Sequence, residues 1–234
     1  MVLTKYDIAR LIDLSCVQAR NTLTDIQNMV HAAKEHQVIC VHSLPCNVLY
    51  VKELLQGEKD VLLGCPVGFP AGGNNVRVKI YELEKAIEDG VQEIDVVMNI
   101  GWIVSENYDA VEKELSEIIR HAQNVPIKAL MEVSLLSDGM IETASKIAVN
   151  AGAAFVKTGT GWNGKPTSYH DIQVIRQAVG EQIKIKASGG IRGLDMLLNM
   201  YKLGASRFGV GLTHAIDILD EMKKYPDGVV IEEL

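Results

Sequence analysis

Residues 153–188 read AAFVKTGTGWNGKPTSYHDIQVIRQAVGEQIKIKAS, and this stretch decides the fold class. The apolar runs at 153–157 and 183–188 have the length and residue types of buried strands, and Tyr169–Val179 between them is predicted to be a helix. A strand, a helix and a second strand form the unit from which parallel sheets are built.

The same unit recurs along the whole chain after a short capped segment at residues 4–10. The apolar runs span residues 11–15, 38–42, 61–67, 93–100, 126–133, 153–157, 183–188 and 206–209. Their starts lie about 22 to 33 residues apart, which is the length of one strand-and-helix unit. Because the runs are almost continuously apolar, they indicate strands buried on both faces. We therefore predict an α/β fold, a (β/α)8 TIM barrel that forms a single domain over residues 1–234 with a short N-terminal helix.

Helices are predicted between these strands. They span residues 24–37, 76–89, 108–123, 140–150, 169–179, 194–202 and 213–224. Thr24 is the expected N-cap of the first, and Gly90 is suited to end the second because glycine tolerates the left-handed conformation. An open doubly wound sheet is the alternative, although no Gly-x-Gly-x-x-Gly motif follows the first strand.

Composition excludes several classes of function. With 47% hydrophobic and 23% charged residues the chain has a globular composition, and a net charge of −7 with 5% aromatic residues argues against nucleic-acid binding. The N-terminus shows no secretory signal, and no apolar stretch reaches the roughly 18 residues of a membrane span. The four cysteines have neither CxxC nor zinc-site spacing. We expect a cytoplasmic protein with free thiols, no metal site and no membrane association.

Charged residues inside the apolar runs are the first candidates for chemistry, because an unpaired buried charge costs several kcal/mol. These residues are Asp95, Glu132, Lys157, Lys184 and Lys186. Side chains alternate along a strand, so Lys184 and Lys186 share one face, which we expect to point into the barrel. In a sequentially wound barrel Lys157 and Lys186 would lie side by side at the C-terminal ends of their strands, where such barrels carry their active sites.

Two adjacent ammonium groups in a pocket of low dielectric cannot both stay protonated at low cost, so one lysine becomes a free amine near neutral pH. A free amine is the nucleophile that forms a Schiff base with a carbonyl substrate. Asp95 and Glu132 could hold the second ammonium or move protons. The alternative is a purely structural network of ion pairs.

Glycine-rich segments end the last three strands at residues 158–161, 188–190 and 209–211. Glycines permit close backbone approach, and their N–H groups can hold an anion. In barrels of this kind the loops after the last two strands commonly bind phosphate. The alternative is ordinary turn chemistry.

The quoted stretch resembles the Schiff-base segment (residues 155–161) and the second-lysine segment (185–192) of the deoxyribose-phosphate aldolase family, and residues 93–101 resemble its acidic strand. The resemblance implies reversible cleavage of 2-deoxyribose 5-phosphate to glyceraldehyde 3-phosphate and acetaldehyde without metal or cofactor. It implies that Lys157 forms the imine, Lys186 lowers the pKa of Lys157, and Asp95 relays protons. The substrate-binding residues that we expect are Asp13, Cys40, Thr158, Gly161, Ser188, Gly189, Gly190, Gly209 and Gly211.

The chain departs from the family pattern at the far end of the pocket. Gly159 replaces a serine, the segment 209–213 lacks the family's hydroxyl residues, and His42-Ser43 stands where Asn-Pro is common. We therefore expect an altered acceptor aldehyde. The alternatives are an imine-forming lyase on another or non-phosphorylated sugar and a non-catalytic sugar-phosphate-binding barrel. General frequency favours a homodimer or higher homo-oligomer. His42, His214 and Trp162 have no role that the sequence assigns.

Overall fold

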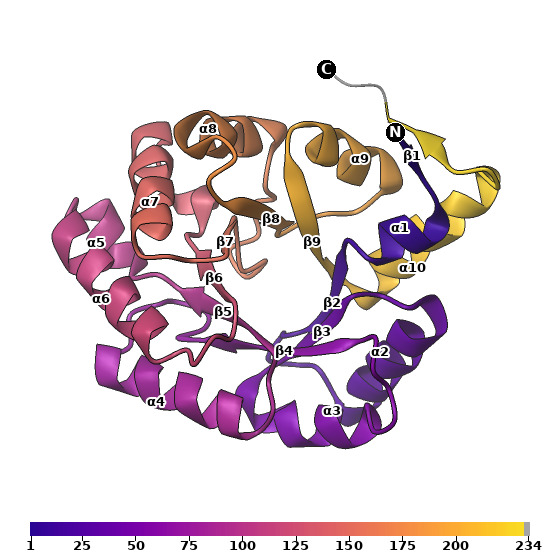
Figure 1. Cartoon of the computed structure of the whole chain (residues 1–234), viewed down its shortest axis with the longest axis horizontal. Helices are drawn as coiled ribbons and strands as arrows, with labels where there is room; N and C mark the ends of the chain where they lie inside the picture. The colour runs from indigo at the N-terminus through magenta and orange to yellow at the C-terminus, as the bar shows by residue number, and fades with distance from the viewer. Residues whose placement is uncertain (232–234) are drawn as a thin grey trace.

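Eight parallel strands close into a barrel in the computed structural model, which describes residues 1–231 (Figure 1). Each strand pairs with the next along the chain, and the first pairs with the last. This topology confirms the predicted (β/α)8 barrel. The strands are β2 (Ile12–Cys16), β3 (Cys40–Ser43), β4 (Leu62–Val67), β5 (Glu93–Val97), β6 (Ile127–Leu130), β7 (Phe155–Lys157), β8 (Lys184–Ser188) and β9 (Ala205–Gly211).

Helices surround the barrel and bury their apolar faces against the outward-facing strand residues (Figure 1). They are α1 (Lys5–Ala9), α2 (Leu23–His36), α3 (Val48–Leu54), α4 (Val76–Glu88), α5 (Ile100–Val104), α6 (Tyr108–Arg120), α7 (Asp138–Asn150), α8 (Tyr169–Val179), α9 (Leu194–Lys202) and α10 (Leu212–Glu221). Short 3₁₀ turns follow β3, β6 and α10, at Pro45–Asn47, Val133–Leu135 and Met222–Lys224. Within residues 1–231, none of the helices has the length and apolarity that crossing a bilayer requires.

Several predicted boundaries were wrong, because a side-chain cap or a left-handed backbone changes the local structure without changing the apolar pattern. The run 93–100 stops being a strand at Val97, since Asn99 caps α5. The run 126–133 stops at Leu130, and Glu132 adopts a left-handed backbone with φ +58°. The N-cap of α2 is Thr22 rather than Thr24, because the Thr22 hydroxyl accepts the N–H of Asp25.

Helices α3 and α5 and one small sheet were not predicted. Both helices span too few residues to show a helical period. The two-residue strands β1 (Val2–Leu3) and β10 (Val229–Val230) pair antiparallel (Figure 1). The predicted helix at 213–224 divides into α10 and a 3₁₀ turn.

Candidate active site

Charged side chains fill much of the barrel interior. Alternation along the strands turns them inward, and each is buried. Three carboxylates face four cationic groups, so the interior carries one excess positive charge when all are ionised. The carboxylates are Asp13, Glu93 and Asp95, and the cations are Lys128, Lys157, Lys186 and Arg207.

Asp95 on β5 holds two of these lysines through one oxygen. Its Oδ2 accepts from Lys157 Nζ at 2.7 Å and from Lys186 Nζ at 2.8 Å. The two lysines pair in register on β7 and β8, as predicted from their strands. Lys186 also lies 2.6 Å from Asp13 Oδ2. Each ammonium therefore has a carboxylate partner, and the two share Asp95.

The pKa of Lys157 is lowered to about 8. Burial is the largest cause, the Lys186 ammonium adds to it, and the Asp95 carboxylate opposes both. The second lysine was the expected cause of this lower pKa, whereas the loss of hydration on burial lowers the pKa more. Burial alone would raise the pKa of Asp95, but Lys157 and Lys186 hold it well below its ordinary value. Lys157 is thus partly a free amine at neutral to mildly alkaline pH, beside a permanent carboxylate.

A second layer of ion pairs lies deeper in the barrel. Lys128 Nζ is 2.5 Å from Glu93 Oε2, and Arg207 bonds both Asp13 (2.7 Å) and Glu93 (3.0 Å). Lys128, Glu93 and Arg207 were not predicted from the sequence, whereas Asp13 was predicted as a substrate-binding residue. Lys128 sits in the apolar run of β6 and satisfies the same criterion that selected Lys157. Asp13 links the two layers, because Arg207 and Lys186 hold its two oxygens.

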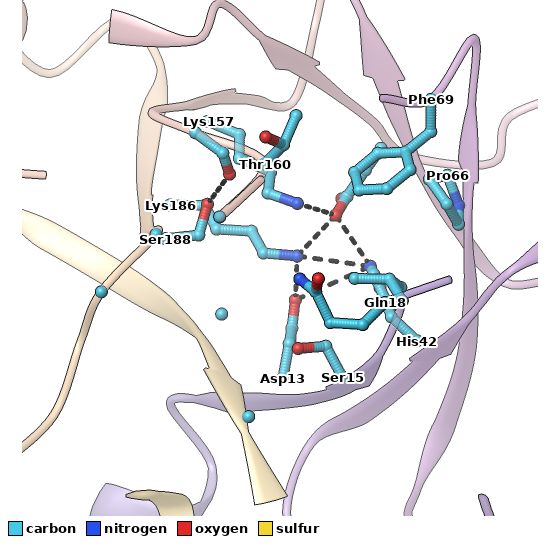
Figure 2. Close-up of a pocket in the computed structure, with 18 residues that line it drawn as sticks. Asp13, Ser15, Gln18, His42, Pro66, Phe69, Lys157, Thr160, Lys186 and Ser188 are labelled. Atoms are coloured by element: carbon cyan, nitrogen blue, oxygen red, sulfur yellow. Dashed lines mark hydrogen bonds and ion pairs between the residues drawn. The ribbon is translucent and has the colours of Figure 1, made fainter. Parts of the chain in front are cut away.

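A cavity of about 180 Å³ opens above the lysines at the C-terminal ends of the strands (Figure 2). Lys157, Lys186, Asp95 and Asp13 line its floor. Phe69 and Pro66 provide apolar contact from the β4 side. The remaining lining residues are Ser15, Val17, Gln18, His42, Gly159, Thr160, Gly161, Ser188, Gly189, Gly190, Gly209 and Gly211.

Glycines form the wall of the cavity next to β8 and β9. Gly190 has φ +81°, and a Cβ there would lie 2.5 Å from Pro166 Cβ, so only glycine fits. Helix α10 starts directly after Gly211 and has no side-chain N-cap. The first N–H groups of a helix lack internal partners and favour anions. The Ser188 hydroxyl instead donates to Gly159 O at 2.6 Å. This wall can hold an anion mainly through backbone N–H groups.

Four residues singled out from the sequence lie elsewhere. Glu132 contacts no lysine in the described chain, because its carboxylate accepts the backbone N–H and the hydroxyl of Thr160. Cys40 and Thr158 are fully buried and do not line the cavity; Thr158 Oγ1 instead joins β7 to β8 through Ser188. Lys184 is exposed at the opposite end of the barrel.

Three residues had no role assigned from the sequence, and they lie in different surroundings. His42 is 3% exposed and lies between Asp95 and Lys186. Trp162 lies at the cavity mouth, where its indole N–H donates to Val17 O at 3.0 Å and its ring meets the edge of Phe69. His214 is on the surface of α10, 3.8 Å from Asp217. Only His42 joins the charged floor.

Known proteins match this chain over most of its length. The model for the DeoC/LacD family aldolases matches residues 7–212. A deoxyribose-phosphate aldolase of Rhizobium meliloti is 39% identical over 222 residues, covering 95% of this chain and 90% of the relative. That of Caldicellulosiruptor saccharolyticus is 40% identical over 217 residues, covering 92% and 98%.

Solved structures of similar sequence share the barrel. A putative deoxyribose-phosphate aldolase from Coccidioides immitis superposes with a TM-score of 0.90 at 28% identity, covering 95% of this chain and 88% of the other. The tetrameric deoxyribose phosphate aldolase from Aeropyrum pernix gives 0.85 at 27% identity, covering 94% and 92%.

Proposed function

Because the chain belongs to the DeoC/LacD family of aldolases, we propose that it is a class I aldolase acting on 2-deoxy-D-ribose 5-phosphate. The products are D-glyceraldehyde 3-phosphate and acetaldehyde, and the reaction is reversible. The observation that carries this proposal is Lys157, a buried lysine with a pKa of about 8 that faces the cavity. An amine in such a place is the nucleophile that imine formation requires.

The reaction begins when the Lys157 amine adds to the substrate carbonyl and the adduct loses water to give an iminium ion. Removal of the proton from the C3 hydroxyl breaks the C2–C3 bond, and the electron pair passes into the iminium to give an enamine. Glyceraldehyde 3-phosphate leaves. The enamine carbon then takes up a proton, and water hydrolyses the resulting imine to release acetaldehyde and the Lys157 amine. The iminium accepts the electrons, so the steps need no cofactor.

One neutral lysine balances the charges of the interior, because three cations then face three carboxylates. The lowered pKa of Lys157, about 8, makes this residue the neutral one. Asp95 and Lys186 lie next to the reacting nitrogen, within reach of the protons exchanged during imine formation. We assign Asp95 the proton relay and Lys186 the part of a fixed ammonium that lowers the pKa of Lys157.

The part of the cavity next to α10 indicates that the preferred acceptor aldehyde differs from glyceraldehyde 3-phosphate. Gly211 and Leu212 begin α10 without hydroxyl side chains, so the phosphate would depend on backbone N–H groups. Each missing hydroxyl donor weakens phosphate binding by roughly 1 kcal/mol. As the alternative to glyceraldehyde 3-phosphate, we propose an acceptor that carries no phosphate or that carries additional hydroxyls. Steady-state kinetics on deoxyribose with and without the 5-phosphate test this, and a strong preference for the phosphorylated sugar would contradict it.

Location and assembly are further parts of the proposal. Buried free thiols at Cys16, Cys40 and Cys65 suit a reducing cytoplasm. The Aeropyrum pernix relative is tetrameric, which favours a homo-oligomer for this chain too.

Borohydride trapping separates the proposed aldolase from a non-catalytic sugar-phosphate-binding barrel. The protein is incubated with acetaldehyde, reduced and digested, and an N-ethyl group is expected on Lys157 by mass spectrometry. Lys157→Met should abolish the adduct, whereas Lys184→Met, which changes an exposed lysine on the neighbouring strand, should leave it unchanged. Absence of an adduct on Lys157 in the unmodified protein would exclude the imine mechanism.

A further inference from the structure

His42 occupies a space that the neighbouring strand leaves open for it. It is the third residue of β3 and pairs in register with Gly64 of β4. A Cβ on Gly64 would overlap the imidazole atoms Cε1 and Nδ1. The glycine therefore leaves room for the ring, which reaches Asp95 of β5 and Lys186 of β8.

One nitrogen of His42 contacts both Lys186 and Asp95, which shift the pKa of Lys157 in opposite directions. Nε2 lies 3.3 Å from Lys186 Nζ, in hydrogen-bonding geometry, and 3.1 Å from Asp95 Oδ2. Nδ1 lies 3.5 Å from Cys40 Sγ. In Figure 2, Asp13, His42 and Lys186 point toward one another below the cavity. The hydrogen bond from Lys186 requires the tautomer whose Nε2 is the acceptor and whose Nδ1 carries the proton.

The imidazole stays neutral in this environment. Burial and the Lys186 ammonium lower the pKa of His42 to about 3, and the carboxylates oppose them. Strand β4 contributes Gly64 and Pro66 here, and neither titrates. The titratable groups that face the ring are Asp13 on β2, Cys40 on β3, Asp95 on β5, Lys128 on β6 and Lys186 on β8, with Lys157 and Arg207 one contact further.

The two lysines differ in how many acceptors surround them. An ammonium has three N–H donors. Lys186 finds Asp13, Asp95 and His42 around its Nζ, whereas among the described residues Lys157 bonds only Asp95. More acceptors favour an ammonium over an amine, because a hydrogen bond from a charged donor is stronger. His42 supplies one of those three.

We propose that His42 is a positioning residue that fixes which lysine is the ammonium and which is the amine, by accepting an N–H of Lys186. The neutral ring completes the shell around Lys186 without adding a negative charge that would also favour protonation of Lys157. This inference rests on the proposed imine chemistry. It adds a residue that decides which of two adjacent amines reacts.

The test compares His42→Phe and His42→Leu, which remove both ring nitrogens, with His42→Gln, whose amide oxygen restores an acceptor. Two apolar variants guard against a failure to fold, which circular dichroism reports. Each protein is trapped with acetaldehyde and borohydride from about pH 6 to 10, and the adducts on Lys157 and Lys186 are quantified separately. A hydrogen bond to a charged group is worth about a tenfold change in the ratio of two protonation states.

In the unmodified protein the adduct is expected on Lys157 alone. In the apolar variants the ratio of adducts shifts about tenfold toward Lys186, and the acidic limb of trapping at Lys157 moves to higher pH by about 0.5 to 1 unit. His42→Gln returns both readouts toward the unmodified protein. A merely structural contact would lower activity without changing which lysine reacts.

An apolar variant that folds, still traps only Lys157 and keeps the acidic limb would overturn the role of His42. The proposed aldolase function would survive that outcome, because it stands on trapping in the unmodified protein. Gly64→Ala gives an independent check, since it should displace the ring and change the adduct ratio when His42 is present. In the His42→Leu background it should have no such effect. An equal effect in both backgrounds would also contradict the inference.

Discussion

Replacing Lys157 by methionine should abolish aldol cleavage and at the same time make the protein more stable. Lys157 is 8% exposed, and its pKa falls from the ordinary 10.5 to about 8. Below pH 8 it is protonated both folded and unfolded, so the folded state bears the full cost of the buried charge. Above pH 10.5 it is neutral in both states and the cost vanishes. The contribution of Lys157 to stability therefore rises with pH across this window.

The magnitude follows from the two pKa values. Each pH unit between them corresponds to about 1.4 kcal/mol, so Lys157 costs about 3 kcal/mol at pH 7 and about 1.4 kcal/mol at pH 9.5. Methionine keeps the length of the side chain without the charge. Asp95 Oδ2 retains its bond from Lys186 at 2.8 Å, so the substitution leaves no carboxylate unpaired. Lys157→Met should thus gain about 3 kcal/mol at pH 7 and lose about half of that gain at pH 9.5.

Urea unfolding of both proteins at the two pH values measures this difference. Lys128→Met is the matched control, because Lys128 is also fully buried but its pKa is raised by Asp13 and Asp95 against the effect of burial. Removing it breaks a buried pair with Glu93 and should cost about 3 to 5 kcal/mol. The reasoning fails if Lys157→Met is no more stable than the unmodified protein at pH 7, or if its advantage is the same at both pH values.

Three further substitutions test other parts of the site. Lys186→Met should depress cleavage strongly and move the pH optimum upward, because the pKa of Lys157 rises without the neighbouring ammonium; a pH–rate profile with an unshifted optimum would count against this. Glu132→Ala leaves the buried N–H and hydroxyl of Thr160 without their acceptor. The free energy of unfolding should therefore fall by about 1 to 3 kcal/mol in urea unfolding experiments. An unchanged unfolding midpoint would show that Glu132 does not anchor Thr160. A Cβ at Gly211 would meet no atom within 4 Å, so Gly211→Ser should fold normally and lower the KM for the phosphorylated sugar by roughly fivefold. An unchanged KM would place the phosphate elsewhere.

The sequence predicted the barrel because the relevant signals are local. Eight apolar runs at a regular interval require only composition and spacing, and every one of them became a strand of the barrel. The ends of these runs were less predictable. One strand ends before Asn99, whose side chain caps α5, and another ends before Glu132, whose backbone is left-handed. Neither feature changes the number of apolar residues in the run.

Some charged residues of the barrel interior could be identified from a single apolar run, and others only from several strands together. Lys157 and Lys186 stood out because each is a cation in an apolar run, and their pairing followed from the order of strands. Lys128 carried the same signal and was overlooked. Glu132 carried it too, yet it faces Thr160 instead of a lysine, since the chain leaves the strand before reaching it.

The fold class, the end of the barrel at which the cavity opens and the two adjacent lysines follow from the sequence, because they depend on residue types and on alternation within single strands. The pairing of carboxylates with cations follows only from the closed barrel. The barrel placed Asp95 between both lysines, and it brought His42 over Gly64 from strands that share no sequence pattern. The pKa of Lys157 depends mainly on burial and on charges from other strands. Burial and distances between strands arise from closing the barrel, so no single segment of the sequence contains them.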